Sequence, residues 1–591
     1  MSHIAVRQLD MTVLRFPAVV SGVDEYRHTV KQRRDVRDNF ARIMIESPDT
    51  LREEGLHDLW RLSATEATSV YESMGESGYR TDTLTLTSSA DMRSDPLLSR
   101  EFNCNVIKLI ILNHLVMPMI NRADNPDLKK RLLNERSRRK IAFAYTEKHA
   151  ALGSLLPVDW TTEAKRKDQN LWLVSGSKSY ILHDDYDDYI IFCKTRNRQE
   201  VTQYEESDGD VAVDGEEKSD FTITAFVLPK DRLDSVEEFE EAGIKYQRIW
   251  FPNLLLTTDD MLIMPSEESG NKVKAIKSAA QLAVSSFLLG RMKAACESCG
   301  RHLDATAVDD TTTFGWNYMN ELVLNIYQLE STIYYTAGLF DSFEDRDLTS
   351  ECMIVKAIAN DTSHECVNLV QRILGPGHPV AGPMHDMLEM YDSFLDCPLH
   401  CKILTAIHTL RTWGRYNNDH LHKKVLSFFY VRYWFVDYWR RKPDESGKSR
   451  RMFQLDQIIH SDLAKQADIL EDMIVRMDYM VDDIFCQFWN EVSRAQMQNL
   501  RMGEIECNIF KLIATLTRAS RSMDLQLPGH EQEADLARQA ARKIRYDTQE
   551  LEFYTLQGRI ANWDEDRIRM HHRNILYHGY FPFSPLDKIM Y

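Results

Sequence analysis

Residues 351–404 read ECMIVKAIANDTSHECVNLVQRILGPGHPVAGPMHDMLEMYDSFLDCPLHCKIL, and this stretch decides the fold. Up to Leu374 its apolar residues recur at helical spacing, which predicts a buried helix. Gly375 and Gly377 then mark a turn, because glycine interrupts helical patterns. The last part, from Cys397 to Leu404, contains Pro398 and no carboxylate. The stretch therefore predicts part of a helical domain, and its last segment, Cys397–Leu404, has no acidic side chain.

On both sides of this stretch the pattern changes in a fixed order. Helical spacing covers about Val30–Ile120, Lys272–Leu410 and about Thr412–Tyr591. Short runs rich in β-branched and aromatic residues lie between the first two blocks and predict strands; they are Ile141–Tyr145, Trp172–Val174, Tyr189–Thr195 and Phe221–Leu228. Runs of one type followed by runs of another predict segregated domains of the α+β class.

Four domains follow from these patterns. The predicted ranges are 1–139 for an N-terminal helical domain, 140–265 for a middle β-barrel-like domain, 266–411 for a helical bundle and 412–591 for a C-terminal helical extension. Inside the β domain, the acidic and apolar-poor segment Glu205–Asp220 predicts a surface loop between two strands.

The net charge of −18 argues against general nucleic-acid binding, which needs a basic face to neutralise phosphates. Two basic segments, Lys31–Arg37 and Lys129–Lys140, are predicted to be solvated helix faces. The longest apolar stretch, Leu109–Ile120, falls short of the ~20 residues that span a bilayer and is predicted to be a buried helix.

The ten cysteines are scattered, which favours reduced thiols in an intracellular compartment. Cys296 and Cys299 form a lone CxxC pair, and a second group contains Cys397, His400 and Cys401. A structural zinc ion needs four ligands, so neither group predicts a metal site by itself. Both groups are predicted to be buried small side chains.

Several motifs, in order along the chain, resemble those of the acyl-CoA dehydrogenase family. Residues 142–147 (AFAYTE) are similar to its AFxLTE strand, and residues 175–181 (SGSKSYI) to its NGxKxxI strand. Residues 290–293 (GRMK) resemble its GTMR segment, and Gly375 and Gly377 match its QILGGxGF turn. Residues 516–522 (LTRASRS) resemble the LSRASRS motif of the C-terminal extension found in the very-long-chain enzyme and the ninth member.

The resemblance implies that bound FAD takes a hydride from the acyl β-carbon while a glutamate removes the α-proton. At the register of that glutamate this chain has Pro398, which cannot accept a proton. Asp396 is the nearest substitute, and its structural alternative is a helix cap. The earlier helix that carries the glutamate in some members has Ala280 and Gln281 here. No catalytic residue is therefore assigned.

The resemblance also implies flavin-binding positions, and several of them have changed. The cofactor positions are Thr146, Leu182, Phe314, Gly375 and Gly377. Leu182 and His183 replace a hydroxyl residue and an asparagine, and Pro376 replaces the second glycine of the turn. Thr311 stands where the family has the arginine of RTQFG, and Gln281 replaces the arginine of GRFGM. After Glu147 the polar PSSGSD segment is replaced by residues 148–153 (KHAALG).

These changes predict a divergent mitochondrial acyl-CoA dehydrogenase-like protein that is catalytically inactive and acts as a scaffold or assembly factor for respiratory complex I. The resemblance implies a homodimer on the matrix side of the inner membrane, although Asp10 interrupts the transit-peptide pattern of Arg7 and Arg15. The alternative is an FAD-dependent long-chain acyl-CoA dehydrogenase of fatty acid β-oxidation whose substitute base is Asp396, Glu147 or His400. A third hypothesis is an acyl-CoA binder without redox activity.

The segment Tyr430–Arg441 is aromatic and basic, and it suits an interfacial helix at a membrane. Packing on its own domain is the alternative, because aromatic residues mostly lie in cores.

Overall fold

The structure is a computed structural model. It describes residues 59, 61–84, 96–135, 139–147, 160–168, 170–196, 221–241, 244–266, 269–306, 314–342, 347–375, 388, 391, 397–416, 453–488, 495–556 and 573. The chain forms two compact units that divide between Cys401 and Lys402. The segments around residues 31–37, 205–220 and 430–441 lie outside the described residues, so the interpretations of these segments stay predictions. The four predicted domain boundaries also stay predictions.

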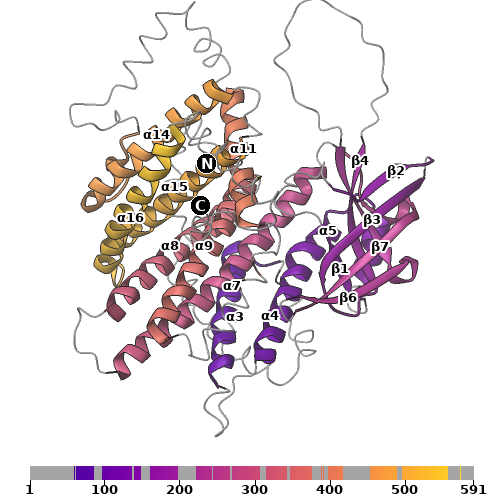
Figure 1. Cartoon of the computed structure of the whole chain (residues 1–591), viewed down its shortest axis with the longest axis horizontal. Coiled ribbons are helices and arrows are strands. Elements are labelled where there is room, and N and C mark those ends of the chain that lie inside the picture. The colour runs from indigo at the N-terminus through magenta and orange to yellow at the C-terminus, as the bar shows by residue number, and fades with distance from the viewer. Residues whose placement is uncertain are drawn as a thin grey trace, which may run out of the picture. The chain divides into compact units, whose positions relative to one another are not determined.

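The first unit contains an eight-stranded sheet (Figure 1). Its strands are β1 (Ile141–Ala144), β2 (Glu163–Arg166), β3 (Leu171–Leu182), β4 (Asp188–Arg196), β5 (Phe221–Pro229), β6 (Ser235–Glu241), β7 (Ile244–Thr257) and β8 (Met261–Ile263). The order is β6-β7-β3-β2-β4-β5-β8, and β1 pairs with β4 in parallel.

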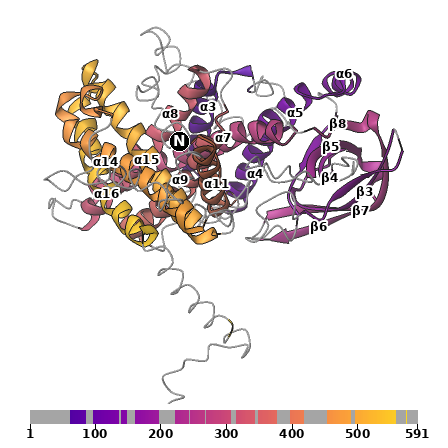
Figure 2. The same ribbon diagram turned by 90° about the horizontal axis from the view of Figure 1, so that it is seen from above.

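The sheet curls around one apolar core. Trp172 of β3 and Phe226 of β5 meet edge to face with ring centroids 6.2 Å apart, although their strands are not neighbours in the sheet. Figure 2 shows β3 and β7 on the far side of the domain from β4 and β5. Because the inward side chains alternate along each strand, closing the sheet removes one whole face from water. The expectation of a β-barrel-like middle domain agrees with this geometry.

The four runs predicted as strands correspond to β1, β3, β4 and β5, and the first run extends one residue beyond β1, to Tyr145. The sequence patterns missed β2, β6, β7 and β8. Strand β6 (SVEEFEE) has glutamates at four of its seven positions, which hides the strand signal. Such charges are typical of edge strands because they discourage pairing with another chain.

In its described residues, the first unit has the helices α3 (Ala64–Leu84), α4 (Pro96–Ile110), α5 (Met117–Asn121), α6 (Pro126–Glu135), α7 (Ser269–Ala305), α8 (Phe314–Ser342) and α9 (Thr349–Leu374). Helices α3, α7, α8 and α9 pack lengthwise (Figure 1). Helix α7 is buried along most of its length, because it contacts helices on several sides.

Helices α3 and α7 cross at two glycines. A Cβ atom added to Gly290 of α7 would overlap the carbonyl oxygen of Glu72, and one added to Gly75 of α3 would overlap that of Phe287. The two backbones are therefore closer than side chains allow. Lys293, one turn beyond Gly290, reaches Glu72 at 2.6 Å and also pairs with Glu330 of α8. The crossing thus brings charges of three helices together.

Gly290→Ala is predicted to destabilise the protein by about 1–3 kcal/mol or more, because the added methyl group forces the two helices apart. The matched control is Gly270→Ala in the same helix, where a Cβ meets nothing within 4 Å. That control should change stability by less than about 1 kcal/mol. Thermal unfolding of both variants measures the difference; equal melting temperatures would contradict the tight crossing.

The apolar stretch Leu109–Ile120 is a buried helix, as predicted, with a π-helical segment at Ile111–Val116 between α4 and α5. Residues 103–121 are the part of the described chain whose length and apolar composition would suffice for a membrane span, but 67% of it is buried inside the protein.

His114 lies in this helix beside Tyr71, with ring centroids 5.3 Å apart. Burial lowers the pKa of His114 to about 4, so the imidazole is neutral at physiological pH.

The second unit contains most of α11 (Pro398–Tyr416), together with α14 (Ala464–Phe488), α15 (Gln496–Asp524) and α16 (His530–Leu556). Gly503 of α15 lies against the backbone of Lys402, so this unit also has a close helix contact. Arg545 of α16 bonds both Asp472 of α14 and Glu552, each at 2.9 Å. Arg476 pairs with the same two carboxylates, and the four side chains form a closed ring of alternating charge.

Candidate functional site

Pro398 begins helix α11. The amide of Cys401 donates to the carbonyl oxygen of Cys397 at 3.1 Å and closes the first turn. Proline suits the first helical position because its missing N–H would have no intrahelical partner there. No aspartate or glutamate occurs between Cys397 and Tyr416. Asp396, the substitute base proposed from sequence, lies outside the described residues.

Some family members are expected to carry the catalytic glutamate at a second position, which lies on α7 in this chain. That position also has no acidic side chain. Ala280 and Gln281 are both buried, with exposed fractions of 0% and 2%. The carboxylates of α7 are Glu297 and Asp304, which lie toward the other end of the helix. Neither of the two positions that the family resemblance suggests for the catalytic glutamate therefore has a carboxylate in this chain.

Glu147, another proposed base, is held in a buried ion pair. Its carboxylate lies 2.9 Å from the Lys178 ammonium and accepts from the Thr161 amide and hydroxyl, both at 2.7 Å, and from the Thr162 amide at 3.1 Å. Burial by itself raises the pKa of Glu147, but Lys178 and the threonine donors outweigh it and lower that pKa to about 2. A general base works best with a pKa near the operating pH, so Glu147 is a structural group.

The partner of Glu147 is equally enclosed. Lys178 has no exposed surface and its ammonium lies 4.4 Å from the centroid of the Trp160 ring. It also donates to the carbonyl oxygen of Tyr145 at 3.1 Å. Gly176 precedes it at φ +150°, where a Cβ would lie 2.7 Å from Thr162 Cα. The SGSK segment is therefore explained by packing and by this ion pair.

Glu147→Gln is predicted to cost about 3–5 kcal/mol, because it leaves Lys178 buried without a counter-charge. The control is Glu240→Gln on exposed β6, which should stay within about 0.5 kcal/mol of the parent. The folded-state pKa of Glu147 is depressed, so its contribution is present above 4.5 and is lost as pH falls toward about 2. The difference in the free energy of unfolding between the parent and Glu147→Gln should therefore become smaller as the pH falls from 4.5 toward about 2. A constant gap would contradict the pKa shift.

The positions that the resemblance assigns to a flavin offer few donors. Thr146 is half-buried, and its carbonyl oxygen accepts from the Ser179 amide at 2.9 Å. Leu182 is 6% exposed and has an alkyl side chain. Gly375 ends α9 at φ +90°. Phe314 is the first residue of α8, but its side chain lies outside the described residues, as does Gly377.

A lysine lies over the residue before Thr146. The Lys277 ammonium from α7 is 4.4 Å from the centroid of the Tyr145 ring and 3.4 Å from its hydroxyl. Lys277 is only 8% exposed, and the Trp160 ring packs against Tyr145 at 5.1 Å. The sequence patterns did not indicate this contact, although a lysine within the apolar pattern of α7 was a signal for it. Among the described positions, Leu182 therefore offers no side-chain donor to a flavin, and the Lys277 ammonium is directed at Tyr145.

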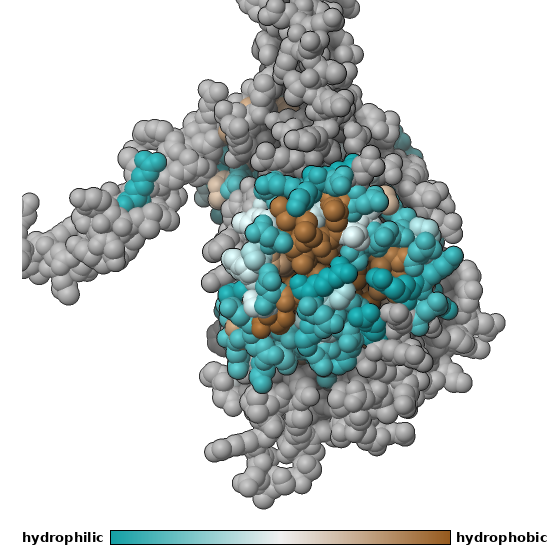
Figure 3. All heavy atoms as spheres, turned by 90° about the vertical axis from the view of Figure 1, so that its right-hand side faces the viewer, coloured by the Kyte–Doolittle hydropathy of each residue, from teal (hydrophilic) through white to brown (hydrophobic). Residues whose placement is uncertain are grey.

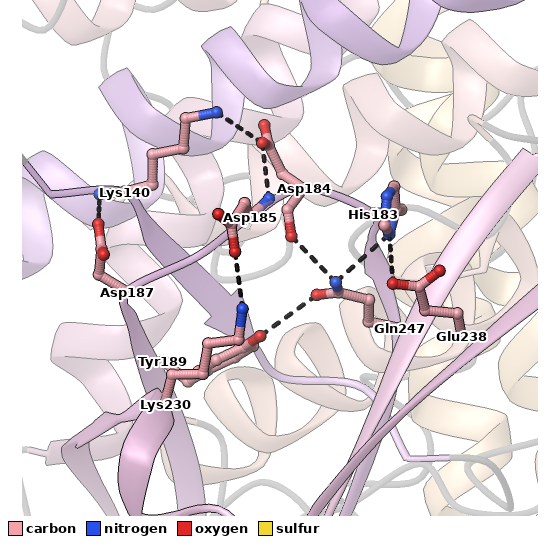
Figure 4. A network of polar contacts seen from close by, with 9 residues as sticks. All are labelled: Lys140, His183, Asp184, Asp185, Asp187, Tyr189, Lys230, Glu238 and Gln247. Carbon is pink, nitrogen blue, oxygen red and sulfur yellow. Dashed lines mark hydrogen bonds and ion pairs between the residues drawn. The ribbon is translucent and has the colours of Figure 1, made fainter.

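The turn after Leu182 is fixed by polar contacts (Figure 4). Asp184 accepts from Lys140 at 2.6 Å and from the Asp185 amide at 2.8 Å, and it pairs with Lys108 of α4 at 3.2 Å. Burial raises the pKa of Asp184, but these partners outweigh it and lower the pKa to about 2.

The other side of the same turn is held by Gln247 of β7. Its amide group donates to the carbonyl oxygen of Asp184 at 2.9 Å and lies 3.3 Å from His183 Nδ1. Glu238 of β6 lies 3.4 Å from the same His183 nitrogen. His183, which replaces the family's asparagine, therefore belongs to a structural network that joins β3, β6 and β7.

A second buried group lies at the GRMK segment. Arg291 is 1% exposed, and its Nη2 donates to Asn103 Oδ1 of α4 at 2.7 Å. Its guanidinium is 5.7 Å from the Phe287 ring, which packs against Tyr391 at 5.4 Å. Arg291 stands at the threonine position of the GTMR motif. A large charged side chain thus fills core space that the family motif gives to a small one.

His400, the remaining candidate base, is half-buried at the start of α11. Its Nε2 atom is buried and has no hydrogen-bond partner in the described part of the chain. Cys299 and Cys401 are buried, as expected, but Cys296 and Cys397 are only half-buried. Burial raises the pKa of Cys296 to about 11 and that of Cys299 to about 12, so both are thiols. Within the described ranges, no group of three or more His, Cys, Asp or Glu could hold a metal ion.

Comparison with known proteins agrees with the fold. A crystal structure of an acyl-CoA dehydrogenase complexed with FAD from Bacillus anthracis aligns with a TM-score of 0.63 and 14% identity, over 96% of this chain and 94% of that chain. Butyryl-CoA dehydrogenase from Megasphaera elsdenii aligns with a TM-score of 0.42 and 16% identity, over 64% of this chain and 98% of that chain.

The chain therefore has the acyl-CoA dehydrogenase fold, and the resemblance inferred from its motifs is confirmed. Its residues 461–562 match the family model "ACAD9/ACADV, C-terminal domain". This range covers most of α14, all of α15 and α16, and the motif at residues 516–522.

Proposed function

We propose that this chain is a mitochondrial acyl-CoA dehydrogenase-like protein that has lost the dehydrogenase reaction and acts as a scaffold or assembly factor for respiratory complex I. The loss of the reaction is inferred from the start of α11. Pro398 stands at the position where the family has its catalytic glutamate, and no acidic residue follows up to Tyr416. Glu147 does not replace it, because Lys178 and two threonines hold its carboxylate.

The role in assembly is supported by the second unit. Residues 461–562 match the C-terminal domain of ACAD9/ACADV, and the description of that model names the ninth family member. The unit is stabilised by contacts that need no ligand: the closed ring of Arg476, Asp472, Arg545 and Glu552, and the close approach of Gly503 to Lys402. The folded surfaces are what a scaffold requires, so they would be kept after catalysis is lost. A homodimer on the matrix side of the inner membrane is part of this proposal.

The alternative is a long-chain acyl-CoA dehydrogenase with a substitute base. One observation favours it: His400 Nε2 is buried at the start of α11 and has no hydrogen-bond partner in the described part of the chain. Imidazole is the commonest general base in enzymes, so its position next to the lost glutamate makes His400 the residue to test. FAD would supply the hydride acceptor in that case.

The purified full-length protein, reconstituted with excess FAD and desalted, is predicted to show no flavin absorbance, because Leu182 has no side-chain donor and Pro376 removes a backbone donor. Long-chain acyl-CoA should then produce no change in the visible spectrum. Flavin bands that acyl-CoA bleaches in the parent, but not in His400→Ala, would contradict the proposal and establish the alternative. Flavin bands that acyl-CoA leaves unchanged would show that the cofactor is bound without catalysis.

Removal of this protein from mitochondria of the organism that carries it is predicted to lower the amount of assembled complex I. Wild type and His400→Ala should restore assembly equally, since no base is needed. Gly503→Ala, which forces α15 away from the backbone of Lys402, should restore it less. Native gel electrophoresis of complex I measures all three. Unchanged complex I after removal would disprove the assembly role while leaving the loss of catalysis untouched.

A further inference from the structure

One nitrogen atom of His183 lies between two side chains that require opposite states of it (Figure 4). The Nδ1 atom is 3.3 Å from Nε2 of Gln247 in β7 and 3.4 Å from Oε1 of Glu238 in β6. Gln247 and Glu238 are directly opposite each other in the β6–β7 ladder, so their side chains lie on the same face of the sheet. The imidazole can therefore bond to either of two neighbouring strands, according to whether Nδ1 carries a proton.

The orientation of the Gln247 amide is fixed by its other two contacts. Its nitrogen donates to the carbonyl oxygen of Asp184 at 2.9 Å, and its oxygen accepts from the Tyr189 hydroxyl at 3.3 Å. A flipped amide would point its oxygen at the Asp184 carbonyl oxygen, which has no hydrogen to donate. Gln247 is therefore a donor toward His183 Nδ1, and this contact requires a neutral ring that carries its proton on Nε2.

Glu238 requires a donor at the same atom. A neutral imidazole has one proton for its two nitrogens and can leave Nδ1 free to accept, whereas the charged ring has a proton on both nitrogens and can only donate. Protonation therefore breaks the hydrogen bond from Gln247 and favours the ion pair with Glu238. The side chains of His183 and Glu238 are 39% and 62% exposed, so the pair exchanges protons freely with water. Histidine side chains ordinarily change their charge between about pH 5 and 8.

The elements around His183 carry further charged groups. They are Lys108, Lys140, Asp184, Asp185, Asp187, Lys230, Glu240 and Lys245. Lysines hold two aspartates of the turn, at 2.6 Å from both Asp184 and Asp185. Lys245 meets His183 through its backbone, where its carbonyl oxygen accepts from the His183 amide at 3.0 Å. Within the described residues, Glu238 is the charged side chain in direct contact with the imidazole.

The exchange of partners changes how the edge strand β6 is held. In the strand order β6 is next to β7, and β3 is on the other side of β7. His183 follows the last residue of β3, so its ion pair with Glu238 ties β6 to the end of β3 across the strand between them. The turn that carries His183 is itself anchored to α4, because Asp184 pairs with Lys108 at 3.2 Å.

We infer that His183 is a pH-sensitive link between the turn after β3 and the edge strand β6. When the ring is charged, it binds Glu238 and fixes β6 to the turn. When the ring is neutral, it accepts from Gln247, so β6 is released from the turn while the turn keeps its contact with β7. The mobility of one edge of the sheet thus follows the pH of the surrounding solution.

A second contact between β6 and β3 does not titrate. Phe239 follows Glu238 in β6 and points to the opposite face, because side chains alternate along a strand. Its ring meets that of Tyr180 in β3 with centroids 5.6 Å apart. Figure 3 shows that apolar side chains gather among polar ones on the outer surface of the sheet domain. Loss of the pair between His183 and Glu238 should therefore loosen β6 without detaching it.

The first test follows the histidine itself by NMR of the full-length protein, labelled with ¹³C at the Cε1 atoms of histidine. His183→Asn assigns the His183 signal by its loss. Glu238→Gln should move the midpoint of its titration to lower pH by about 0.2–0.7 pH units, the range that exposed ion pairs give. The matched control is Glu240→Gln, on the same face of β6, which should move the midpoint much less. A shift in Glu238→Gln no larger than that in the control would overturn the inference.

The second test measures the strand by hydrogen–deuterium exchange of the peptides that contain β6. Variants and parent are compared at the same pH, so that the intrinsic pH dependence of exchange cancels. At about pH 5.5 the parent should exchange several-fold more slowly than His183→Asn and Glu238→Gln, and at about pH 8 all three should be equal, because the ring is then neutral. Glu240→Gln should follow the parent at both values, and equal melting temperatures at the higher pH show that the variants are folded. Equal exchange of the parent and both link variants at the lower pH would contradict a link between His183 and β6.

Discussion

The close crossing of α3 and α7 is the constraint on which most of the first unit depends. Two backbones can approach this closely only where neither has a side chain, and Gly75 and Gly290 meet that condition. The approach brings Lys293 within reach of Glu72 and Glu330, so the packing requirement also places one ammonium between two largely buried carboxylates. The crossing fixes α7 along its length, and α7 in turn places Lys277 over Tyr145 and Arg291 against Asn103.

The same positions show which polar side chains serve the packing of the fold. A general base must be free to change protonation, but the carboxylate of Glu147 is stabilised in its charged form by Lys178 and the threonine donors. Pro398 suits the first position of helix α11, because its missing N–H would have no intrahelical partner there. Arg291 and Lys277 occupy buried positions with their own partners. Structural demands are satisfied at each of these points without a cofactor.

The two units are stabilised by similar kinds of contact, namely close backbone approaches at glycines and ion pairs between helices. In the second unit Gly503 permits a close backbone contact with Lys402, and a ring of two arginines and two carboxylates joins α14 to α16. Burial raises the pKa of Glu552, while Arg545 and Arg476 oppose that shift. Breaking one member of such a ring leaves charges without partners, which is more costly than losing a single surface pair. Both units are therefore specified by their internal contacts.

The sequence by itself determined the class of fold. Periodicity identified the helical blocks and four strands, motif order indicated the family, and Pro398 in the register of the glutamate needed no coordinates. The edge strand β6 escaped because its glutamates break the expected alternation. Only the tertiary structure showed that Lys178 forms an ion pair with Glu147 and that the Lys277 ammonium lies over the Tyr145 ring. It also showed that Gly75 and Gly290 lie at the same helix crossing. These contacts join residues far apart in the chain, and local patterns contain no information about which distant groups the folded backbone brings within hydrogen-bond distance.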